Sequence, residues 1–196
     1  MAVATWPTNG DLIADVVKMG YLYQSDVVLD PTYGLGVFWS KWRPDNLIAS
    51  DLNPSKSPAG HSVDFCNLPH PPNWFDAVVF DPPYKLNGTP SDTDARYGVD
   101  VVRTWQDRHR LIRDGITECV RVLRPGGFLL LKCQDQVSSG KVRWQTIEFA
   151  NHAASCGGMT LEDVFMPMGY RPQPPGRRQL HTRRNYSSLM IFQKPK

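Results

Sequence analysis

The chain has 196 residues, a formal net charge of +3 and a hydrophobic content of 41%. This length suits a single domain with a full hydrophobic core, and so small a net charge does not by itself indicate a nucleic-acid partner. The 4 cysteines are widely spaced without a CxxC pair, which is typical of reduced intracellular thiols and predicts no metal site and no disulfide framework. We see no secretory signal and no apolar run of the ~20 residues that a membrane helix needs, so we expect a cytoplasmic protein with no membrane partner.

The first predicted element is a short amphipathic helix at residues 11–20. Apolar residues recur there at helical spacing, Thr8 or Asn9 can cap its start, and Gly20 can end it. The segment that leads into the helix begins with Trp6, Pro7 and Thr8.

A buried strand at 26–30 is predicted next, and it runs directly into a turn that contains Gly34 and Gly36. Glycines allow tight dihedral angles and let a ligand approach the backbone closely. Residues 37–42 then predict a helix. The dinucleotide fingerprint GxGxxG would need a glycine at position 39, where Trp39 stands, so a nicotinamide or flavin site is disfavoured.

Two further strands are expected at 47–53 and 61–65, and each carries an acid. Asp51 follows the glycine turn by about 20 residues, the position from which a carboxylate can bind ribose hydroxyls. Asp64 can accept a hydrogen bond from an adenine amino group while Phe65 packs beside that ring. An ordinary turn acid is an equally good interpretation of Asp64.

The apolar run 77–80 predicts a buried parallel strand that ends at Asp81-Pro82-Pro83-Tyr84. The prolines cannot continue a strand, so the chain leaves the sheet at a carboxyl end, where open α/β sheets bind their ligands. The Asp81 carboxylate and the Pro82 carbonyl can both accept hydrogen bonds from an exocyclic NH2 group, and Tyr84 can stack on a planar base. Taken alone, these residues also fit an ordinary strand-to-loop turn.

The polar stretch 85–102 lacks a helical or strand pattern, and its place after the proposed base-binding turn favours a substrate lid. A helix is predicted at 103–124, a strand at 128–133, a helix at 142–155, and strands at 161–166 and 188–192. Between the last two strands, the basic loop at 167–186 contains no acid within 171–184. Clustered arginine favours phosphate contacts over a merely solvated loop, so nucleic-acid binding is assigned to Arg171, Arg177, Arg178, Arg183 and Arg184.

These motifs together resemble the class I S-adenosylmethionine-dependent methyltransferases, and more narrowly the enzymes that methylate adenine N6 or cytosine N4. Asp81-Pro82-Pro83-Tyr84 matches the family's catalytic motif residue for residue, and Asp51 matches its ribose-binding acid. The resemblance covers nearly the whole chain. It implies a Rossmann-like α/β fold: a seven-stranded, mostly parallel sheet with an antiparallel last strand and helices on both faces. The residues that it implies for cofactor binding are Trp6, Thr8, Asp30, Pro31, Thr32, Gly34, Gly36, Asp51, Leu52, Asp64, Phe65 and Asp81.

The resemblance implies transfer of a methyl group from S-adenosyl-L-methionine to a nucleobase amine, with N6 of adenine in DNA preferred. An RNA adenine methyltransferase, a DNA cytosine N4-methyltransferase and a non-catalytic subunit that docks a partner on nucleic acid are the alternatives. Thr32 and Tyr33 depart from the Phe-containing form of the family's cofactor motif, which leaves their side-chain contacts open. Residues 1–196 are expected to form one methyltransferase domain without a separate target-recognition domain. Specificity would then come from the lid, the basic loop, a partner or a homodimer.

Overall fold

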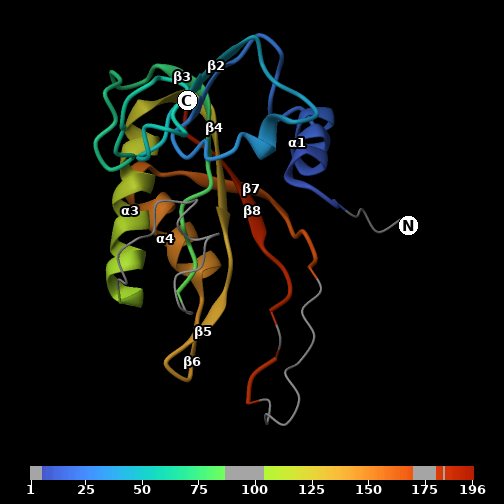
Figure 1. The fold of residues 1–196 in the computed structure, drawn as a ribbon, viewed down its shortest axis with the longest axis vertical. Helices are drawn as coiled ribbons and strands as arrows, with labels where there is room; N and C mark the ends of the chain where they lie inside the picture. The colour runs from blue at the N-terminus through green and yellow to red at the C-terminus, as the bar shows by residue number, and fades with distance from the viewer. Residues whose placement is uncertain (1–5, 87–103, 170–179, 183) are drawn as a thin grey trace.

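The computed structural model describes residues 6–86, 104–169, 180–182 and 184–196, and these form a six-stranded sheet of order β2-β1-β3-β4-β8-β7 (Figure 1). Strands β2, β1, β3 and β4 run parallel to one another, whereas β8 is antiparallel to both β4 and β7. The prediction of a mostly parallel sheet with an antiparallel last strand is confirmed. The strands are β1 (Val27–Asp30), β2 (Asn46–Ala49), β3 (Phe75–Phe80), β4 (Leu123–Cys133), β7 (Thr160–Phe165) and β8 (Ser188–Gln193).

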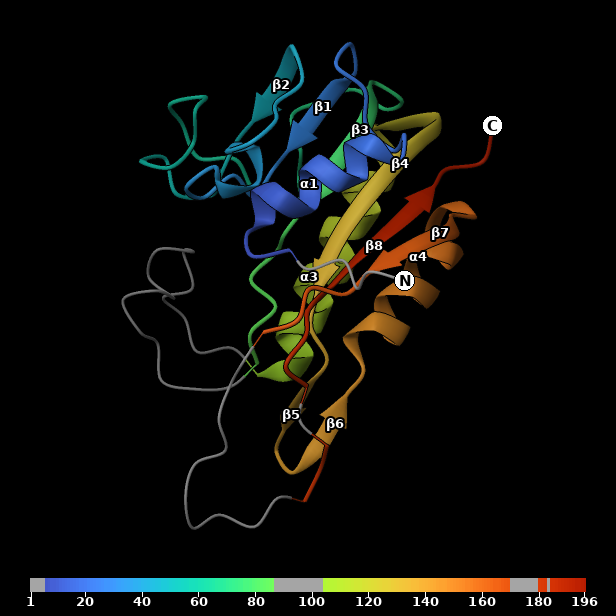
Figure 2. The same ribbon diagram turned by 90° about the vertical axis from the view of Figure 1, so that its right-hand side faces the viewer.

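Helices cover both faces of the sheet, as the view in Figure 2 shows. Helix α1 (Asn9–Lys18) and the short 3-10 helix η1 (Val37–Trp39) lie on one face, and α3 (Trp105–Val122) and α4 (Gln145–Gly157) lie on the other. Each face has its own core: Val79 and Leu130 pack with the α1 side chains, and Phe80 and Leu131 pack with those of α3 and α4. The alternation of neighbouring strand residues between faces explains this division.

The helix ends follow from their capping residues. The Thr8 side chain accepts a hydrogen bond from the backbone of Asp11, whose side chain in turn accepts one from the Thr8 backbone, so α1 begins with a capping box. Thr104 caps α3 in the same position, accepting from the Asp107 N–H. Helix α3 ends at Val122 because the backbone becomes extended at Leu123, the first residue of β4. Pro125, two residues later, could not continue the helix.

Three predicted elements differ from the structure. Residues 61–65 form no strand; a single bridge joins Asp51 to Ser62, so the described residues give six strands in the main sheet rather than seven. The helix expected at 37–42 is only the 3-10 turn η1. The helix expected from residue 142 begins at Gln145, because the preceding residues form a β-hairpin.

The hairpin consists of β5 (Gln136–Ser138) and β6 (Lys141–Arg143), paired antiparallel. Its turn places Ser139 and Gly140 at φ 51° and 71°, a left-handed pair typical of two-residue hairpin loops. In Figures 1 and 2 the hairpin extends beyond the end of α4, away from the sheet. Among the described residues, no helix is long and apolar enough to cross a membrane.

Candidate active site

The end of β1 holds a buried acid with an unusual environment. The Asp30 side chain accepts hydrogen bonds from Trp39 Nε1 at 2.8 Å and from the Thr32 backbone N–H at 3.0 Å. Burial raises the pKa of Asp30 to about 7, against the lowering effect of these donors, and the nearby Asp81 carboxylate raises it further. Trp39, which stands where a dinucleotide site would have glycine, therefore anchors the acid at the end of β1.

The glycine turn is joined to the acid at the end of β2. The Gly34 N–H donates to Asp51 Oδ2 at 2.9 Å, while Asp51 Oδ1 accepts from the Asn53 N–H at 2.8 Å. An ionised carboxylate has about four acceptor positions, so two remain for hydroxyl groups of a ligand. Gly36 has φ 66°, and a Cβ placed there would lie 2.5 Å from the Tyr33 hydroxyl oxygen. The turn thus requires glycine both for its backbone and for space.

Asp81 lies directly after β3 and is tied to the turn after β1. Its backbone N–H donates to Thr32 Oγ1 at 2.9 Å, and Thr32 is one of the two departures from the family motif. Burial raises the pKa of Asp81, and the charge and hydrogen bonding of Lys132 oppose that rise. Since about a fifth of the Asp81 side chain is exposed, a ligand can still reach the carboxylate.

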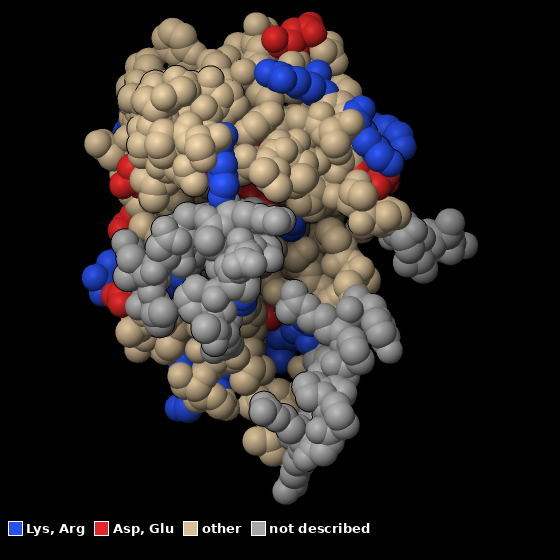
Figure 3. All heavy atoms as spheres, in the orientation of Figure 1, with Lys and Arg blue, Asp and Glu red and all other residues tan. Residues whose placement is uncertain are grey.

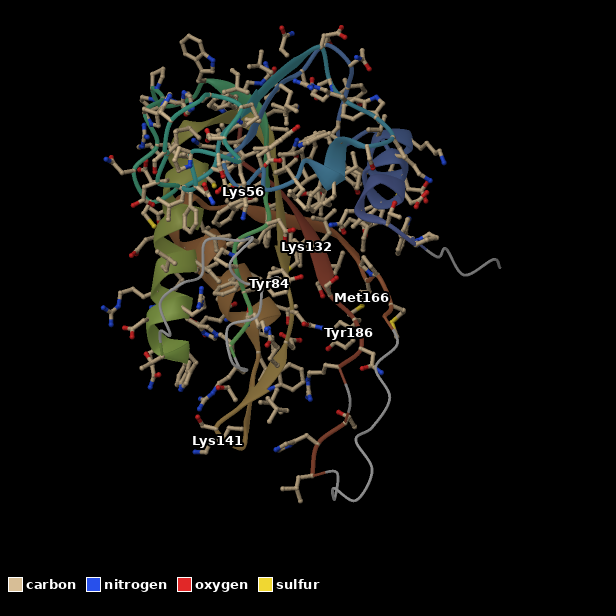
Figure 4. All side chains as sticks on the ribbon, viewed as in Figure 1. Lys56, Tyr84, Lys132, Lys141, Met166 and Tyr186 are labelled. Atoms are coloured by element: carbon tan, nitrogen blue, oxygen red, sulfur yellow. The ribbon has the colours of Figure 1, made fainter. Side chains whose placement is uncertain are left out.

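Lys132 of β4 is the basic partner of Asp81, with 3.7 Å between its Nζ and Asp81 Oδ2. Its side chain is only 9% exposed, Nζ donates to Asn9 Oδ1 at 2.9 Å, and it lies over the Phe38 ring at 5.1 Å from the centroid. The lysine therefore joins the segment after β3 to the start of α1. Figure 4 shows Lys132 and Tyr84 together in the central part of the molecule.

Tyr84 is held through its backbone. Its carbonyl oxygen accepts hydrogen bonds from Gln136 Nε2 and Gln145 Nε2, both at 2.9 Å. The Gln136 side chain also accepts from the Leu86 N–H, so both flanks of Lys85 are fixed. Tyr84 is half-buried, and its side chain packs against the core on the α3 and α4 face. Pro82 is buried and Pro83 is half-buried.

The remaining predicted cofactor residues differ in exposure. Trp6 donates from Nε1 to Asp15 at 2.8 Å and packs edge-on against Phe165, which fixes the segment before α1. Asp64 is exposed and accepts from the Cys66 N–H. The Phe65 ring, in contrast, is buried against Phe80 at 5.1 Å between centroids, so it supports the loop rather than facing outward. Pro31 is buried, and Leu52 is half exposed.

Most of the predicted nucleic-acid residues fall outside the described residues: Arg171, Arg177, Arg178 and Arg183, as does most of the proposed lid at 85–102. Arg184 is described, and its guanidinium lies 4.6 Å from the centroid of the Trp144 ring. Gln134 Nε2 donates to the carbonyls of Arg184 and Tyr186, which ties this part of the basic loop to the end of β4.

Sequence reasoning missed three side chains of this site: Lys132, Gln136 and Gln145. A signal existed for the first, because a lysine interrupts the apolar run of β4 and a buried lysine requires a partner. The glutamines carried no such signal. Within the described part of the chain, no cluster of three or more His, Cys, Asp or Glu side chains could hold a metal ion.

Comparison with solved structures identifies the fold. The chain superposes on a candidate methyltransferase from Bacillus halodurans with a TM-score of 0.60 and 14% identity, covering 94% of this chain and 99% of the other. The chain described here has the methyltransferase fold. TrmN from Thermus thermophilus matches with a TM-score of 0.59 and 16% identity. The match covers 94% of this chain and 48% of TrmN, so this chain spans about half of that protein.

A SAM-dependent methyltransferase from Aquifex aeolicus matches with a TM-score of 0.52 and 13% identity, over 93% of this chain and 89% of the other. All three proteins share the Rossmann-like α/β fold seen here. No protein-family model and no curated protein sequence matches the chain.

Proposed function

We infer that this protein is an S-adenosylmethionine-dependent methyltransferase that modifies the exocyclic amine of a nucleobase, with N6 of adenine in DNA as the preferred acceptor. The observation that carries the proposal is Asp81-Pro82-Pro83-Tyr84 at the carboxyl end of β3, with the Asp81 carboxylate partly open and linked through Thr32 to the turn after β1. Two adjacent strands thus bring a hydrogen-bond acceptor for an amine next to a turn suited to a cofactor.

The residues at the ends of β1 and β2 fit the cofactor. Gly36 lets the turn adopt a left-handed backbone conformation, and Asp51 keeps two acceptor positions for ribose hydroxyls after binding Gly34 and Asn53. Exposed Asp64 can accept from an adenine amino group, and the segment from Trp6 to Thr8 borders α1 on the same face of the sheet as Lys132. When bound, the cofactor supplies a methyl group already activated by a positive sulfur.

The protein's own groups then position the acceptor. The Asp81 carboxylate and the Pro82 carbonyl accept hydrogen bonds from the base NH2, which favours a pyramidal nitrogen with its lone pair aimed at the methyl group. The Tyr84 ring stacks on the base, an interaction worth roughly 1–3 kcal/mol. As positive charge develops on the nitrogen, the Asp81 carboxylate stabilises it, and the proton leaves to Asp81 or to water.

Replacement of Asp81 tests this function. We expect Asp81→Ala to lose methyl transfer by at least a factor of about 10²–10³ while S-adenosyl-L-methionine still shifts its melting temperature. Asp114→Ala removes an exposed acid from α3 and serves as the matched control. The assay is labelled methyl transfer to DNA and RNA oligonucleotides, followed by mass spectrometry of the nucleosides. Near wild-type turnover by Asp81→Ala would refute the proposed chemistry, and N4-methylcytosine or methylated RNA would reassign the acceptor.

A further inference from the structure

The β5–β6 hairpin begins and ends at residues that hold the proposed base-binding turn. Gln136, the first residue of β5, donates to the Tyr84 carbonyl, and so does Gln145, which follows β6 by two residues. The hairpin is therefore joined to Tyr84 at both of its ends. Lys141 pairs with Ser138, two residues beyond Gln136, which places the start of β6 about 7 Å along the strand from that contact.

Two arginines, one at the end of β6 and one beside the hairpin, are stacked on tryptophan rings. The Arg143 guanidinium lies 3.7 Å from the centroid of Trp105, and that of Arg184 lies 4.6 Å from the centroid of Trp144. Stacking fixes the plane of a guanidinium and leaves its N–H donors at the edges, the geometry that suits bidentate phosphate recognition. Trp144 itself remains 46% exposed.

The cations in and beside this hairpin have no acidic partner in the part of the chain that the structure describes. Across the described residues, no ion pair involves Lys141, Arg143 or Arg184, and the Nε atoms of both arginines are buried without a hydrogen-bond partner. Elsewhere many exposed cations are paired; for example, Lys18 pairs with Asp15. In Figure 3 the lower part of the visible face, where the hairpin lies, shows more basic than acidic side chains.

The basic loop reaches the same place. His181 Nε2 lies 3.0 Å from the carbonyl of Gly140 at the hairpin turn, and Arg184 is tied to Gln134 at the end of β4. Figure 4 shows Lys141 at the tip of the hairpin, beyond Tyr84. Unpaired cations, an exposed indole and a link to the base-binding turn thus meet on one surface.

We propose that this hairpin surface, made of Lys141, Arg143, Trp144 and Arg184, binds the phosphate backbone of the DNA strand next to the target base. The proposal rests on the function inferred above, since it takes Tyr84 as the place of the target base. Lys141 lies about 7 Å along the strand from the contact between Gln136 and the Tyr84 carbonyl, a distance that corresponds to roughly two stacked nucleotides. The hairpin therefore holds the strand on one side of the target base and fixes its position.

The test compares the wild type with Lys141→Gln/Arg143→Gln in binding to a fluorescent 12-nucleotide single-stranded DNA over a range of NaCl concentrations. Each lost phosphate contact lowers the slope of log K against log salt by about 0.7, so we expect a decrease of about 1.4 and a weaker affinity. Lys18→Gln/Arg43→Gln removes the same charge at the amino end of the sheet and should leave the slope unchanged. Arg143→Lys keeps the charge and should retain most of the wild-type slope.

Steady-state methyl transfer separates this proposal from the function on which it rests. We expect the double variant to raise KM for DNA with little change in kcat, because the hairpin contacts phosphates and not the reacting nitrogen. A wild type that transfers methyl groups beside a variant with unchanged slope and KM would overturn the hairpin surface alone. If the wild type transfers no methyl group to any nucleic acid, yet the double variant shows the expected loss of slope, the proposed function is overturned and the surface is supported. If the double variant does not fold, exposed Lys141→Gln should still lower the slope by about 0.7.

Discussion

Replacement of Lys132 by methionine tests whether a buried ion pair stabilises the segment that contains Asp81. Methionine preserves most of the side-chain volume but removes the charge that lies 3.7 Å from Asp81. Loss of one partner from a buried pair costs about 3–5 kcal/mol, because the other charge stays buried and uncompensated. Since Asp81 is about a fifth exposed, we expect the lower end of this range, about 3 kcal/mol, or a melting temperature lower by roughly 6–12 °C.

The effect should depend on pH in a definite direction. Burial already raises the pKa of Asp81 above its unfolded value, and removal of Lys132 raises it further. An acid with a raised folded-state pKa is stabilising when protonated, and this stability is lost as the pH rises through the folded pKa. The destabilisation by Lys132→Met should therefore be largest at neutral and alkaline pH and should shrink as the pH falls and Asp81 takes up a proton.

The measurement is urea unfolding at several pH values of Lys132→Met, of Asp81→Asn and of the double variant Lys132→Met/Asp81→Asn. In the double variant the uncompensated charge is absent, so its loss of stability should be smaller than the sum of the two single losses. Additive losses, or a Lys132→Met effect that is the same at all pH values, would show that the lysine acts only through packing and its bond to Asn9.

Two further predictions concern the end of β1. Burial raises the pKa of Asp30 from the usual 3.8 to about 7, so ionisation of Asp30 destabilises the fold increasingly as the pH rises towards 7. The free energy of unfolding of Asp30→Asn, measured in urea, should therefore rise by about 3 kcal/mol relative to that of the wild type between pH 5 and 8. A constant difference between the two proteins would contradict the raised pKa. Thr32→Val leaves the Asp81 N–H without its acceptor and should cost about 1–3 kcal/mol, whereas Thr32→Ser keeps the acceptor and should cost less. Equal losses in both variants, seen in thermal unfolding, would remove the hydrogen bond as the cause.

The sequence predicted the main strands well because their residues report local burial. The apolar runs at 77–80 and 128–133 lie within β3 and β4, and the two prolines after Asp81 end β3 where predicted. The prediction of a strand at 61–65 was wrong because a short alternation of polar and apolar residues occurs in loops as well as in strands. Here Phe65 packs inward from a loop. There the ring reaches the core without strand pairing: a Cβ on Gly115 of α3 would lie 2.6 Å from it.

The contacts of the site were less predictable because they join residues far apart in the chain. Thr32 and Asp81 are 49 positions apart, and Gln145 lies 61 positions beyond Tyr84. Nothing in the local pattern around a glutamine indicates that its amide will fix a distant carbonyl. The hairpin was hidden for a similar reason: each strand has only three residues, too few for a periodic pattern, and the following helix made 142–144 look helical.

The two acids at the ends of β1 and β3 are placed so that their protonation differs. Asp30 is buried without a cation, and its pKa of about 7 leaves it largely protonated just below neutral pH. Asp81 is also partly buried, but Lys132 favours its ionised form. Because like charges on neighbouring strands oppose each other, a proton on Asp30 makes ionisation of Asp81 easier. For the carboxylate that would accept hydrogen bonds from the base amine, Lys132 and a proton on Asp30 thus both oppose the rise in pKa that burial causes.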